Sequence, residues 1–451
     1  MHPSQESYFF TKFFVMTTKS GPLFILLLIC AIACSVFIVG FTRYRPIKQE
    51  TVHLPSCCQK PKSAECVFRT ILNLEDFDTV GLMRNSRMVK ASIQHGLSWI
   101  ARAQGNEGGW GAGSHLHQEI LDPHAVEPDP ATTAIVGMAL LRCGTTLSTG
   151  TYAENLRKAT NYLLLAIENT PSNQIKITSL TNTQPQVKLG QNIDVILTSQ
   201  FLSNLTKCVN FESNTKHRIE KDLKICIDKI QKGQDTDGGW KDGGWAPVLQ
   251  SALANNALES AKDQGFAVDS AVMEKSRDYQ KGNFDLRTSS VVTGKSAGVL
   301  LYAISGSGRA TAKEANLAQI SINQAKKEGK LKKEDKITEE NLIVAGMSRP
   351  DAKKYITAYR INQFATTKAQ SEDIMSGFGS NGGEEFLSYL MTGESLVLNG
   401  GPEWLTWYDN MTGRLIQIQN NEGSWSGHHC ITSPVFCTAT CLLVLSIDSD
   451  L

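Results

Sequence analysis

The sequence lacks an excess of charge of either sign. Its 451 residues include 45 lysines and arginines and 44 aspartates and glutamates, which gives a formal net charge of +1. A chain with this balance has no overall basic field, so nucleic-acid binding through net charge is excluded. The phosphate-binding pattern G-x-x-x-x-G-K-S/T is also missing, which argues against a P-loop nucleotide site. A neutral substrate and a protein partner are both compatible with this composition.

The alternation of apolar and polar residues that is typical of half-buried strands is almost missing as well. The composition, 41% hydrophobic and 20% charged, is that of a globular protein. From about residue 85 onward the apolar residues follow a helical period, and we expect about ten to twelve helices paired as hairpins. The predicted fold class is therefore all-α.

One long uncharged run lies near the N-terminus, from Leu23 to Phe41. It has about the minimum length that crosses a bilayer. We predict a short tail (1–22), a transmembrane anchor (23–41) and a linker (42–80), and hence a single-pass membrane protein. A cleaved secretory signal and a lipoprotein signal ending at Cys34 are the alternatives. Basic residues flank the run on both sides, so its orientation is not predicted: Lys12, Lys19, Arg43, Arg45 and Lys48.

The eleven cysteines occupy different settings. Cys57, Cys58 and Cys66 follow the predicted anchor, where an exported chain could form a disulfide. Four others lie in apolar, helical stretches, where we expect buried free thiols: Cys143, Cys208, Cys226 and Cys441.

A repeated unit is the most informative feature of the chain. It occurs as "QGNEGGW" (104–110), "QDTDGGW" (234–240) and "QNNEGSW" (419–425), each at the end of an apolar helical stretch. The glycine after the acid supplies the positive φ of a tight exit. We expect the tryptophan to fold back over the helix end, with its N–H on a carbonyl, and the glutamine amide to bridge loop groups.

A helix rich in small residues is predicted after each unit, at 131–144, 249–261 and 436–447. Small side chains let such helices approach closely. The region 318–370 departs from this pattern because it is long, charged and helix-prone, and we predict a charged helical insertion with solvated lysine faces.

The units resemble the QW-type repeats of squalene cyclases and of protein prenyltransferase β subunits. The resemblance covers about residues 85–447 and is strongest at the three Gln–Trp units. It implies an α/α toroid of antiparallel helix hairpins for residues 81–451, in which an outer ring surrounds an inner ring and the last unit touches the first. It also implies an apolar or isoprenoid-like ligand in a central chamber.

Two functional motifs of these families are altered here. The cyclases' Asp-rich motif, D-x-D-D-T-A, corresponds to "EPDPATTA", in which Glu127 and Asp129 are the acids and Pro130 takes the third position. Asp129 is a candidate general acid, and it is also placed to cap the following helix. The prenyltransferase zinc set is not intact, because Cys437 stands at the histidine position and no Asp-x-Cys pair precedes it.

Histidines and cysteines gather in "GHHCITSPVFC", between the last two predicted helices. These side chains can bind zinc or activate a nucleophile, although their spacing matches no established zinc signature: His428, His429, Cys430 and Cys437. Structural turn chemistry is the alternative interpretation.

Three more histidines, His115, His117 and His124, lie in the loop of the first unit. Ring closure would bring this loop beside the last one. We predict that four candidate catalytic residues line the mouth of the chamber, and we assign no cofactor: Asp129, His124, His428 and Cys430.

Two functions are consistent with these observations. The first is a membrane-anchored toroid that binds an apolar or isoprenoid ligand, with or without turnover. The second is a noncatalytic repeat scaffold that presents its rim loops to a protein or cell-envelope partner. A deep apolar cavity inside the ring would favour the first, and a ring filled by side chains would favour the second.

Overall fold

A computed structural model describes residues 86–206, 213–285, 287–288, 290–399 and 403–450. The predicted tail, anchor and linker, the cysteines at 57, 58 and 66, and Cys208 lie outside the described residues.

The described chain is mostly helical and has almost no strand, which confirms the predicted all-α class. The helices are α2 (Arg87–Arg102), α3 (Pro130–Arg142), α4 (Ala153–Glu168), α5 (Gln184–Leu189), α6 (Ile193–Leu205), α7 (Ser213–Lys232), α8 (Pro247–Asp263), α9 (Ser270–Lys281), α10 (Leu300–Lys327), α11 (Glu339–Val344), α12 (Arg349–Ala369), α13 (Glu372–Met375), α14 (Gly383–Asn399), α15 (Glu403–Gln417) and α16 (Pro434–Leu445). Short 3-10 turns are η2 (His115–His117), η3 (Pro123–Ala125) and η4 (Ile447–Asp450). One antiparallel pair, β1 (Phe284–Asp285) and β2 (Ser290–Val291), forms the strands of the described residues.

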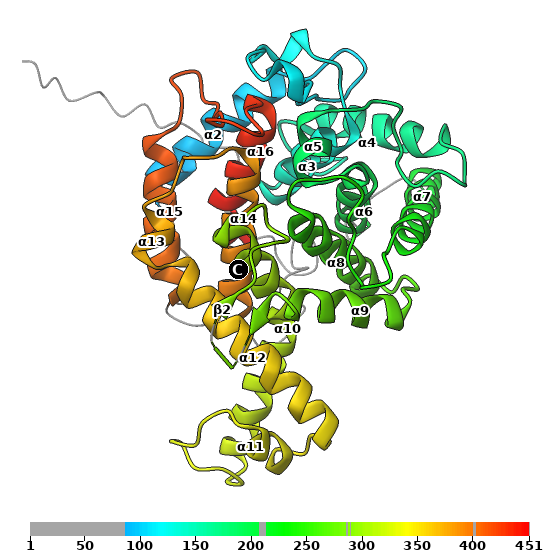
Figure 1. Cartoon of the computed structure of the whole chain (residues 1–451). Helices are drawn as coiled ribbons and strands as arrows, with labels where there is room; N and C mark the ends of the chain where they lie inside the picture. The colour runs from blue at the N-terminus through cyan, green and yellow to red at the C-terminus, as the bar shows by residue number, and fades with distance from the viewer. Residues whose placement is uncertain (1–85, 207–212, 286, 289, 400–402, 451) are drawn as a thin grey trace, which may run out of the picture. The chain divides into compact units, whose positions relative to one another are not determined.

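Six helices contact one another in a closed order: α3 with α6, α6 with α8, α8 with α10, α10 with α14, α14 with α16, and α16 with α3 (Figure 1). Six others alternate with them along the chain, and each contacts at least one of the first six: α2, α4, α7, α9, α12 and α15. We call the first six the inner helices and the second six the outer helices.

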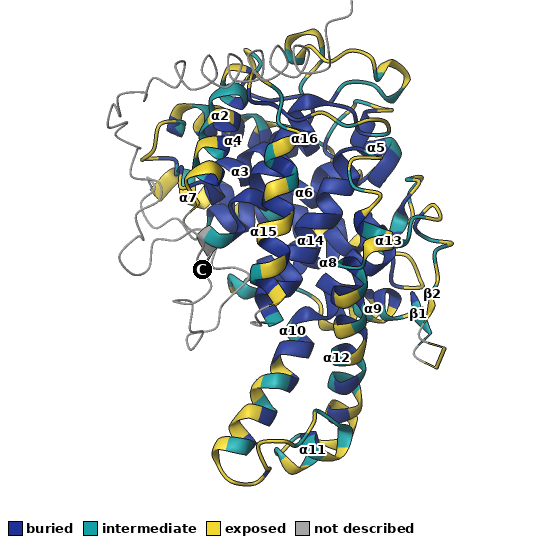
Figure 2. Cartoon of the chain, turned by 90° about the vertical axis from the view of Figure 1, so that its left-hand side faces the viewer, coloured by how far each residue is buried: buried dark blue, intermediate teal, exposed yellow. Residues whose placement is uncertain are grey.

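Burial separates the two sets of helices. Every residue of α3 and of α16 is buried, whereas α2 buries only one face (Figure 2). The inner helices pack closely because small residues lie at their contacts: a Cβ added to Gly137 of α3 would meet the Phe201 ring of α6 at 2.6 Å. Three of them, α3, α8 and α16, begin with proline at the first turn, where no backbone N–H is needed. These three are the small-residue helices predicted from the sequence.

Residues 318–370 lie in the distal part of α10, in α11 and in α12. The first half of α10 packs among the inner helices, and its second half runs on beside α12 toward α11 (Figure 2). A small apolar cluster of their own holds these segments together: Ala318, Ile322, Ala325, Leu331, Leu342, Ala352 and Ile356.

The predicted membrane localisation needs correction. Among the described residues, no helix is both long enough and apolar enough to span a bilayer. The inner helices are largely buried, but they carry hydroxyls, amides and charged groups along their length. The run at 23–41, from which the prediction came, lies outside the described residues.

Candidate functional site

The three Gln–Trp units form the same clasp, as predicted. In each, the indole Nε1 donates to the backbone carbonyl ten residues earlier: Trp110 to Ile100 at 2.8 Å, Trp240 to Ile230 at 2.9 Å, and Trp425 to Leu415 at 2.8 Å. All three rings are about 1% exposed or less. The ring therefore covers the end of the outer helix and gives a side-chain donor to a carbonyl near that end.

The glutamine of each clasp joins two outer helices. Its side-chain nitrogen donates to a loop carbonyl four residues on and to a carbonyl of the next outer helix: Gln104 to Gly108 and Asn155, Gln234 to Gly238 and Val272, and Gln419 to Gly423 and Ser92. The last of these joins the last outer helix, α15, to the first, α2. First and last units are therefore neighbours, as the resemblance implied.

Each clasp needs a glycine for two reasons: its backbone φ is positive, and there is no room for a Cβ atom. Gly108, Gly238 and Gly423 have φ values of 90°, 89° and 106°. A Cβ at Gly238 would lie 2.2 Å from the carbonyl oxygen of Lys275, on the neighbouring outer helix. The two helices can approach this closely only because the glycine has no side chain.

A hydroxyl on the inner helix that follows each clasp completes it. The sequence analysis did not predict this contact. The tryptophan backbone N–H donates to this hydroxyl at 2.9 Å in all three units: Trp110 to Thr133, Trp240 to Ser251, and Trp425 to Thr438. The available signal was a serine or threonine in the first turns of each small-residue helix. Such a hydroxyl fixes the loop to the inner helix as well as to the outer one.

Asp129 caps α3. Its Oδ1 accepts from the backbone N–H of Thr132 at 2.8 Å, and its Oδ2 accepts from the Thr132 hydroxyl at 2.8 Å and from the backbone N–H of Ala112 at 2.9 Å. Burial raises the pKa of this carboxyl, and these hydrogen bonds oppose the rise. Each oxygen thus already has a protein donor, as a capping residue requires. A catalytic role for Asp129 stays a prediction.

Cys430 lies in a cluster of polar groups where the last loop meets the N-terminus of α14. It is a non-glycine residue with a positive φ, 72°, a conformation that costs about 1 kcal/mol or more. Its Sγ lies 2.8 Å from the Nδ1 of His429. Burial and the Glu384 carboxylate raise the pKa of the thiol to about 11, against the opposing effect of Lys188. Burial, His428 and Lys188 lower the pKa of His429. The thiol therefore stays protonated at neutral pH and forms a hydrogen bond with the imidazole ring.

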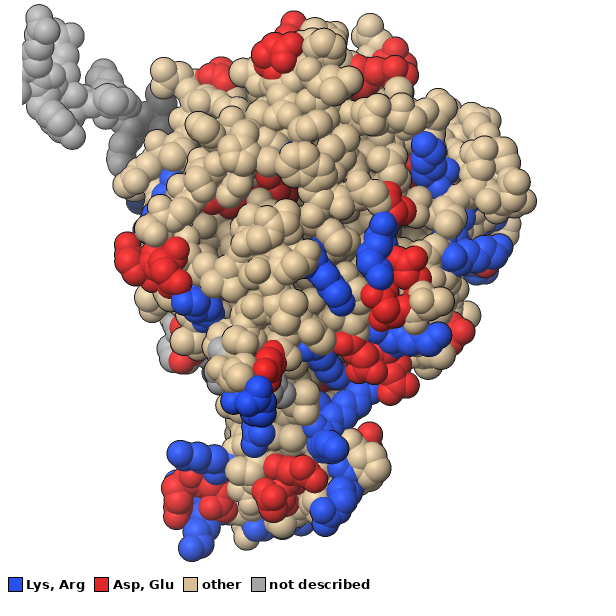
Figure 3. Space-filling view, in the orientation of Figure 1, with Lys and Arg blue, Asp and Glu red and all other residues tan. Residues whose placement is uncertain are grey.

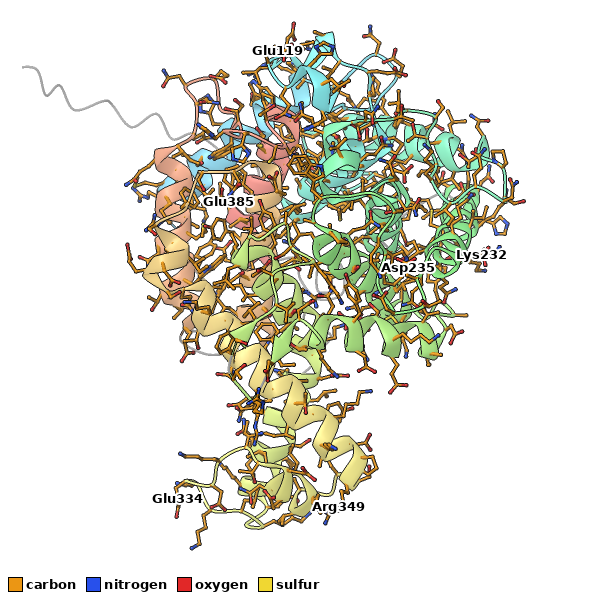
Figure 4. All side chains as sticks on the ribbon, in the orientation of Figure 1. Glu119, Lys232, Asp235, Glu334, Arg349 and Glu385 are labelled. Atoms are coloured by element: carbon orange, nitrogen blue, oxygen red, sulfur yellow. The ribbon has the colours of Figure 1, made fainter. Side chains whose placement is uncertain are left out.

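The two glutamates at the start of α14 hold this part of the rim together. Glu384 accepts from the Tyr302 hydroxyl at 3.3 Å and from the backbone N–H of Ile431 at 3.2 Å. Glu385, labelled in Figure 4, accepts from the backbone N–H groups of Gly379 and Asn381, both at 2.8 Å. Both carboxylates therefore accept hydrogen bonds from backbone amides of the loops, and these bonds hold the loops against the start of α14.

We expect the thiol of Cys430 to react slowly. With a pKa of about 11, only about one thiol in a thousand is ionised at pH 8. The rate of iodoacetamide labelling, followed residue by residue with mass spectrometry, should rise steeply only above about pH 10. Glu384→Gln should increase the rate at pH 8, because it removes the negative charge that raises the thiol pKa. A labelling profile centred near pH 8.5, the value of a free thiol, would contradict this account.

The predicted site residues are only partly brought together. His115 and Cys430 share the neighbourhood of Lys188, which affects the pKa of both. His428 and His429 are exposed, whereas Cys437 is fully buried and donates to the carbonyl of Ile431. Within the part of the chain that the structure describes, no three histidine, cysteine or acidic side chains are placed to hold a metal ion. The metal candidates therefore do not form a ligand set.

His124 lies in the wall of a cavity of about 260 Å³ beside the first clasp, and its grouping with Cys430 stays a prediction. The cavity is lined by the loop itself: Gly105, Asn106, Glu107, Gly109, Trp110, Gly111, Pro123, His124, Val126, Glu127 and Pro128. Two glutamates and a histidine make its wall polar and acidic. This chemistry suits a cationic group better than an isoprenoid.

As expected, Cys226 and Cys441 are buried free thiols, and Cys143 is a buried cysteine. Burial raises the pKa of the Cys226 thiol, as does the nearby Asp222 carboxyl. These cysteines are therefore part of the packing and are poor nucleophiles.

A chain of ion pairs crosses the inside of the inner helices, and sequence reasoning missed it. Arg142 of α3 lies 2.9 Å from Glu394 of α14, although α16 separates these two helices in the closed order. Arg309 of α10 lies 3.1 Å from Glu394 and 3.1 Å from Glu259 of α8. The side chains are 1% to 6% exposed. Only in α3 is such a charge, Arg142, the single one of its helix, because α8, α10 and α14 each contain other charged residues.

The charges of this chain compensate one another. Burial raises the pKa of Glu259, but Lys313, Arg309 and Arg277 outweigh it, so that the pKa lies below its usual value. Arg142 also donates to the backbone carbonyl of Leu443 on α16 at 3.2 Å. A buried charge network that is paired in this way fills space with polar groups. It contrasts with the apolar chamber that the family resemblance implied.

Comparison with known proteins adds little to this geometry. No family model and no curated protein matches the chain. Among solved structures, the chain is similar to the apo form of the type II terpene cyclase MstE from Scytonema, at 13% identity over 80% of this chain and 98% of that chain, with a TM-score of 0.30. A similarity at this level carries no argument, so function has to be inferred from the chain's own residues.

Proposed function

We propose that this chain is a noncatalytic repeat scaffold, an α/α toroid whose rim loops bind a protein partner. The observation that carries the proposal is the buried ion-pair chain from Arg142 through Glu394 and Arg309 to Glu259, which joins four inner helices, among them α3 and α14, which are not neighbours in the closed order. The closed order of contacts among the inner helices supports the toroid.

The alternative, an isoprenoid-binding toroid, requires an apolar hollow. An isoprenoid buried among paired arginines and glutamates would either separate the ion pairs or place its hydrocarbon in contact with charged groups. Both outcomes raise the free energy of the complex. Several inner-helix amides and hydroxyls, such as those of Thr198, Ser199 and Asn255, are buried without a hydrogen-bond partner among the described residues. They add further polarity to the interior and do not form a surface for hydrocarbon.

Organic extraction of the purified full-length chain, followed by mass spectrometry, tests the absence of an isoprenoid. We expect only substoichiometric amounts of any polyprenyl or triterpene species. One equivalent of such a species per chain would overturn the proposal. Added farnesol should likewise leave the midpoint of thermal unfolding unchanged, since a ligand that binds only the folded state raises it.

Proximity crosslinking in the producing cells tests the scaffold role directly. We expect a defined protein neighbour that is recovered with the unmodified chain and lost with Trp245→Ala, an exposed rim substitution. Val344→Ala is the matched control, because Val344 is an exposed apolar residue on α11, at the other end of the described structure (Figure 1). The same set of neighbours with all three proteins would count against a rim partner.

A further inference from the structure

Four large apolar side chains are exposed on two loops of the rim. Leu116 is 74% exposed, Trp245 59%, Leu121 48% and Ile120 37%. We call these four residues, with the loop 111–128 that carries three of them, the rim surface. Single exposed apolar residues are ordinary, but several on neighbouring loops indicate an interaction surface.

The loops of the rim surface are held in place by contacts between units. The His115 ring lies edge-on to the Trp245 ring, with 6.0 Å between centroids. The backbone N–H of His115 donates to the carbonyl of Asn182 at 2.8 Å. The Thr432 hydroxyl of the last loop donates to the carbonyl of Gln118 at 2.8 Å. The surface is therefore formed before a partner binds, which lowers the entropy cost of binding.

The whole connection between α2 and α3, which includes the loop 111–128, is acidic. No lysine or arginine occurs between Arg102 and Arg142, while exposed acids are spread along the loop: Glu107, Glu119, Asp122 and Glu127. Figure 3 shows acidic groups along the upper edge of the molecule, where Glu119 is labelled in Figure 4. Two of these acids, Glu107 and Glu127, line the cavity of about 260 Å³ beside the first clasp.

The rim surface already binds one cation of its own chain. The Nζ of Lys188 lies 3.3 Å from the centroid of the Trp245 ring, a geometry in which the ring face attracts positive charge. The apolar side chains, the acidic loop and this ring therefore favour the same kind of ligand, one that is both apolar and positively charged.

We propose that the rim surface binds a basic, amphipathic segment of a protein partner. Its apolar side chains would pack on Leu116, Leu121 and Trp245, and a lysine or arginine would enter the cavity between Glu107 and Glu127. The inference rests on the proposed scaffold function and adds the chemistry of the partner. A second copy of this chain is a poor occupant, because a symmetric contact would place acidic loop against acidic loop.

Selection of random displayed peptides against the full-length chain tests the inference. The enriched sequences should combine lysine or arginine with leucine, isoleucine or aromatic residues. The enriched peptides, made synthetically, should bind about tenfold more weakly to Trp245→Ala, the loss expected for an aromatic anchor. Binding should also weaken as salt is raised and in the triple variant Glu107→Gln, Glu119→Gln, Glu127→Gln. The controls Val344→Ala and Glu334→Gln, at the far end of the described structure, should leave the affinity unchanged.

The outcomes are distinguishable. Enrichment of uncharged or acidic peptides that still depend on Trp245 would overturn the basic segment while leaving the scaffold function standing. An absence of enrichment, or binding that persists unchanged in Trp245→Ala and in the triple variant, would overturn the rim surface as the docking site. Self-association in sedimentation experiments that is lost in Trp245→Ala would show that the occupant is a second copy and would also overturn the proposal.

Discussion

Glu394→Gln is expected to lower the free energy of unfolding by at least about 3–5 kcal/mol, the cost of breaking a buried ion pair by removing one partner. Glu394 is the shared acid of Arg142 and Arg309, at 2.9 Å and 3.1 Å. The substitution removes the carboxylate that Arg142 and Arg309 share, while Arg309 keeps Glu259. Because arginine stays protonated when buried, the charge cannot be removed by a change of pKa.

Denaturant titration followed by circular dichroism measures this effect. Glu154→Gln is the matched control: Glu154 pairs with Arg157 at 2.7 Å, but both side chains are about half exposed or more, so we expect a loss below about 1 kcal/mol. The double variant Arg142→Met, Glu394→Met should recover most of the stability, because it removes one charge of each sign and leaves Arg309 paired with Glu259. If Glu394→Gln and Glu154→Gln lower the free energy of unfolding equally, the chain of ion pairs is not buried in solution.

Trp240→Ala is expected to destabilise the protein by about 3–5 kcal/mol, the usual cost of removing a large buried aromatic side chain. The Trp240 ring is 1% exposed, and its Nε1 donates to the carbonyl of Ile230 at 2.9 Å. The alanine variant leaves a cavity at the end of α7 and removes the indole hydrogen bond to the carbonyl of Ile230. Both losses act at the point where an outer helix is joined to an inner one.

Trp245→Ala provides the comparison, since Trp245 lies in the same loop and has the same side chain. Trp245 is 59% exposed and contacts Lys188 and His115, so its removal should cost less than about 1 kcal/mol. The same denaturant titration measures both variants. If Trp240→Ala and Trp245→Ala lower the free energy of unfolding by the same amount, the clasp is not the element that stabilises each helix pair.

The recurrence of the clasp explains why so much of the local structure could be predicted. The spacing of Gln234, Gly238 and Trp240 is set by contacts within about ten residues, and such contacts are readable in one sequence. The same holds for the proline at the first turn of α3 and for Asp129 as its cap. The hydroxyl partners, Thr133 and its equivalents, were less visible because many serines and threonines occur in these helices.

The candidate site was less predictable. Cys430 and His429 are adjacent in the sequence, but their pKa values depend on Glu384 and Lys188, which lie far away along the chain. His124 lines an acidic cavity with Glu107 and Glu127, and its grouping with Cys430 stays a prediction. Which loops of a closed ring face one another depends on the tilt and length of helices, which a single sequence does not specify.

The sequence alone determined the helical class, the three clasps and the small-residue helices after them, because helical period, tight turns and close packing depend on neighbouring residues. Only the tertiary structure decided what occupies the centre. Arg142 and Glu394 are 252 positions apart, with Glu259 and Arg309 between them, and nothing in their spacing along the chain indicates that they meet. Buried ions are tolerated only when opposite charges meet, and that meeting is a property of the assembled ring.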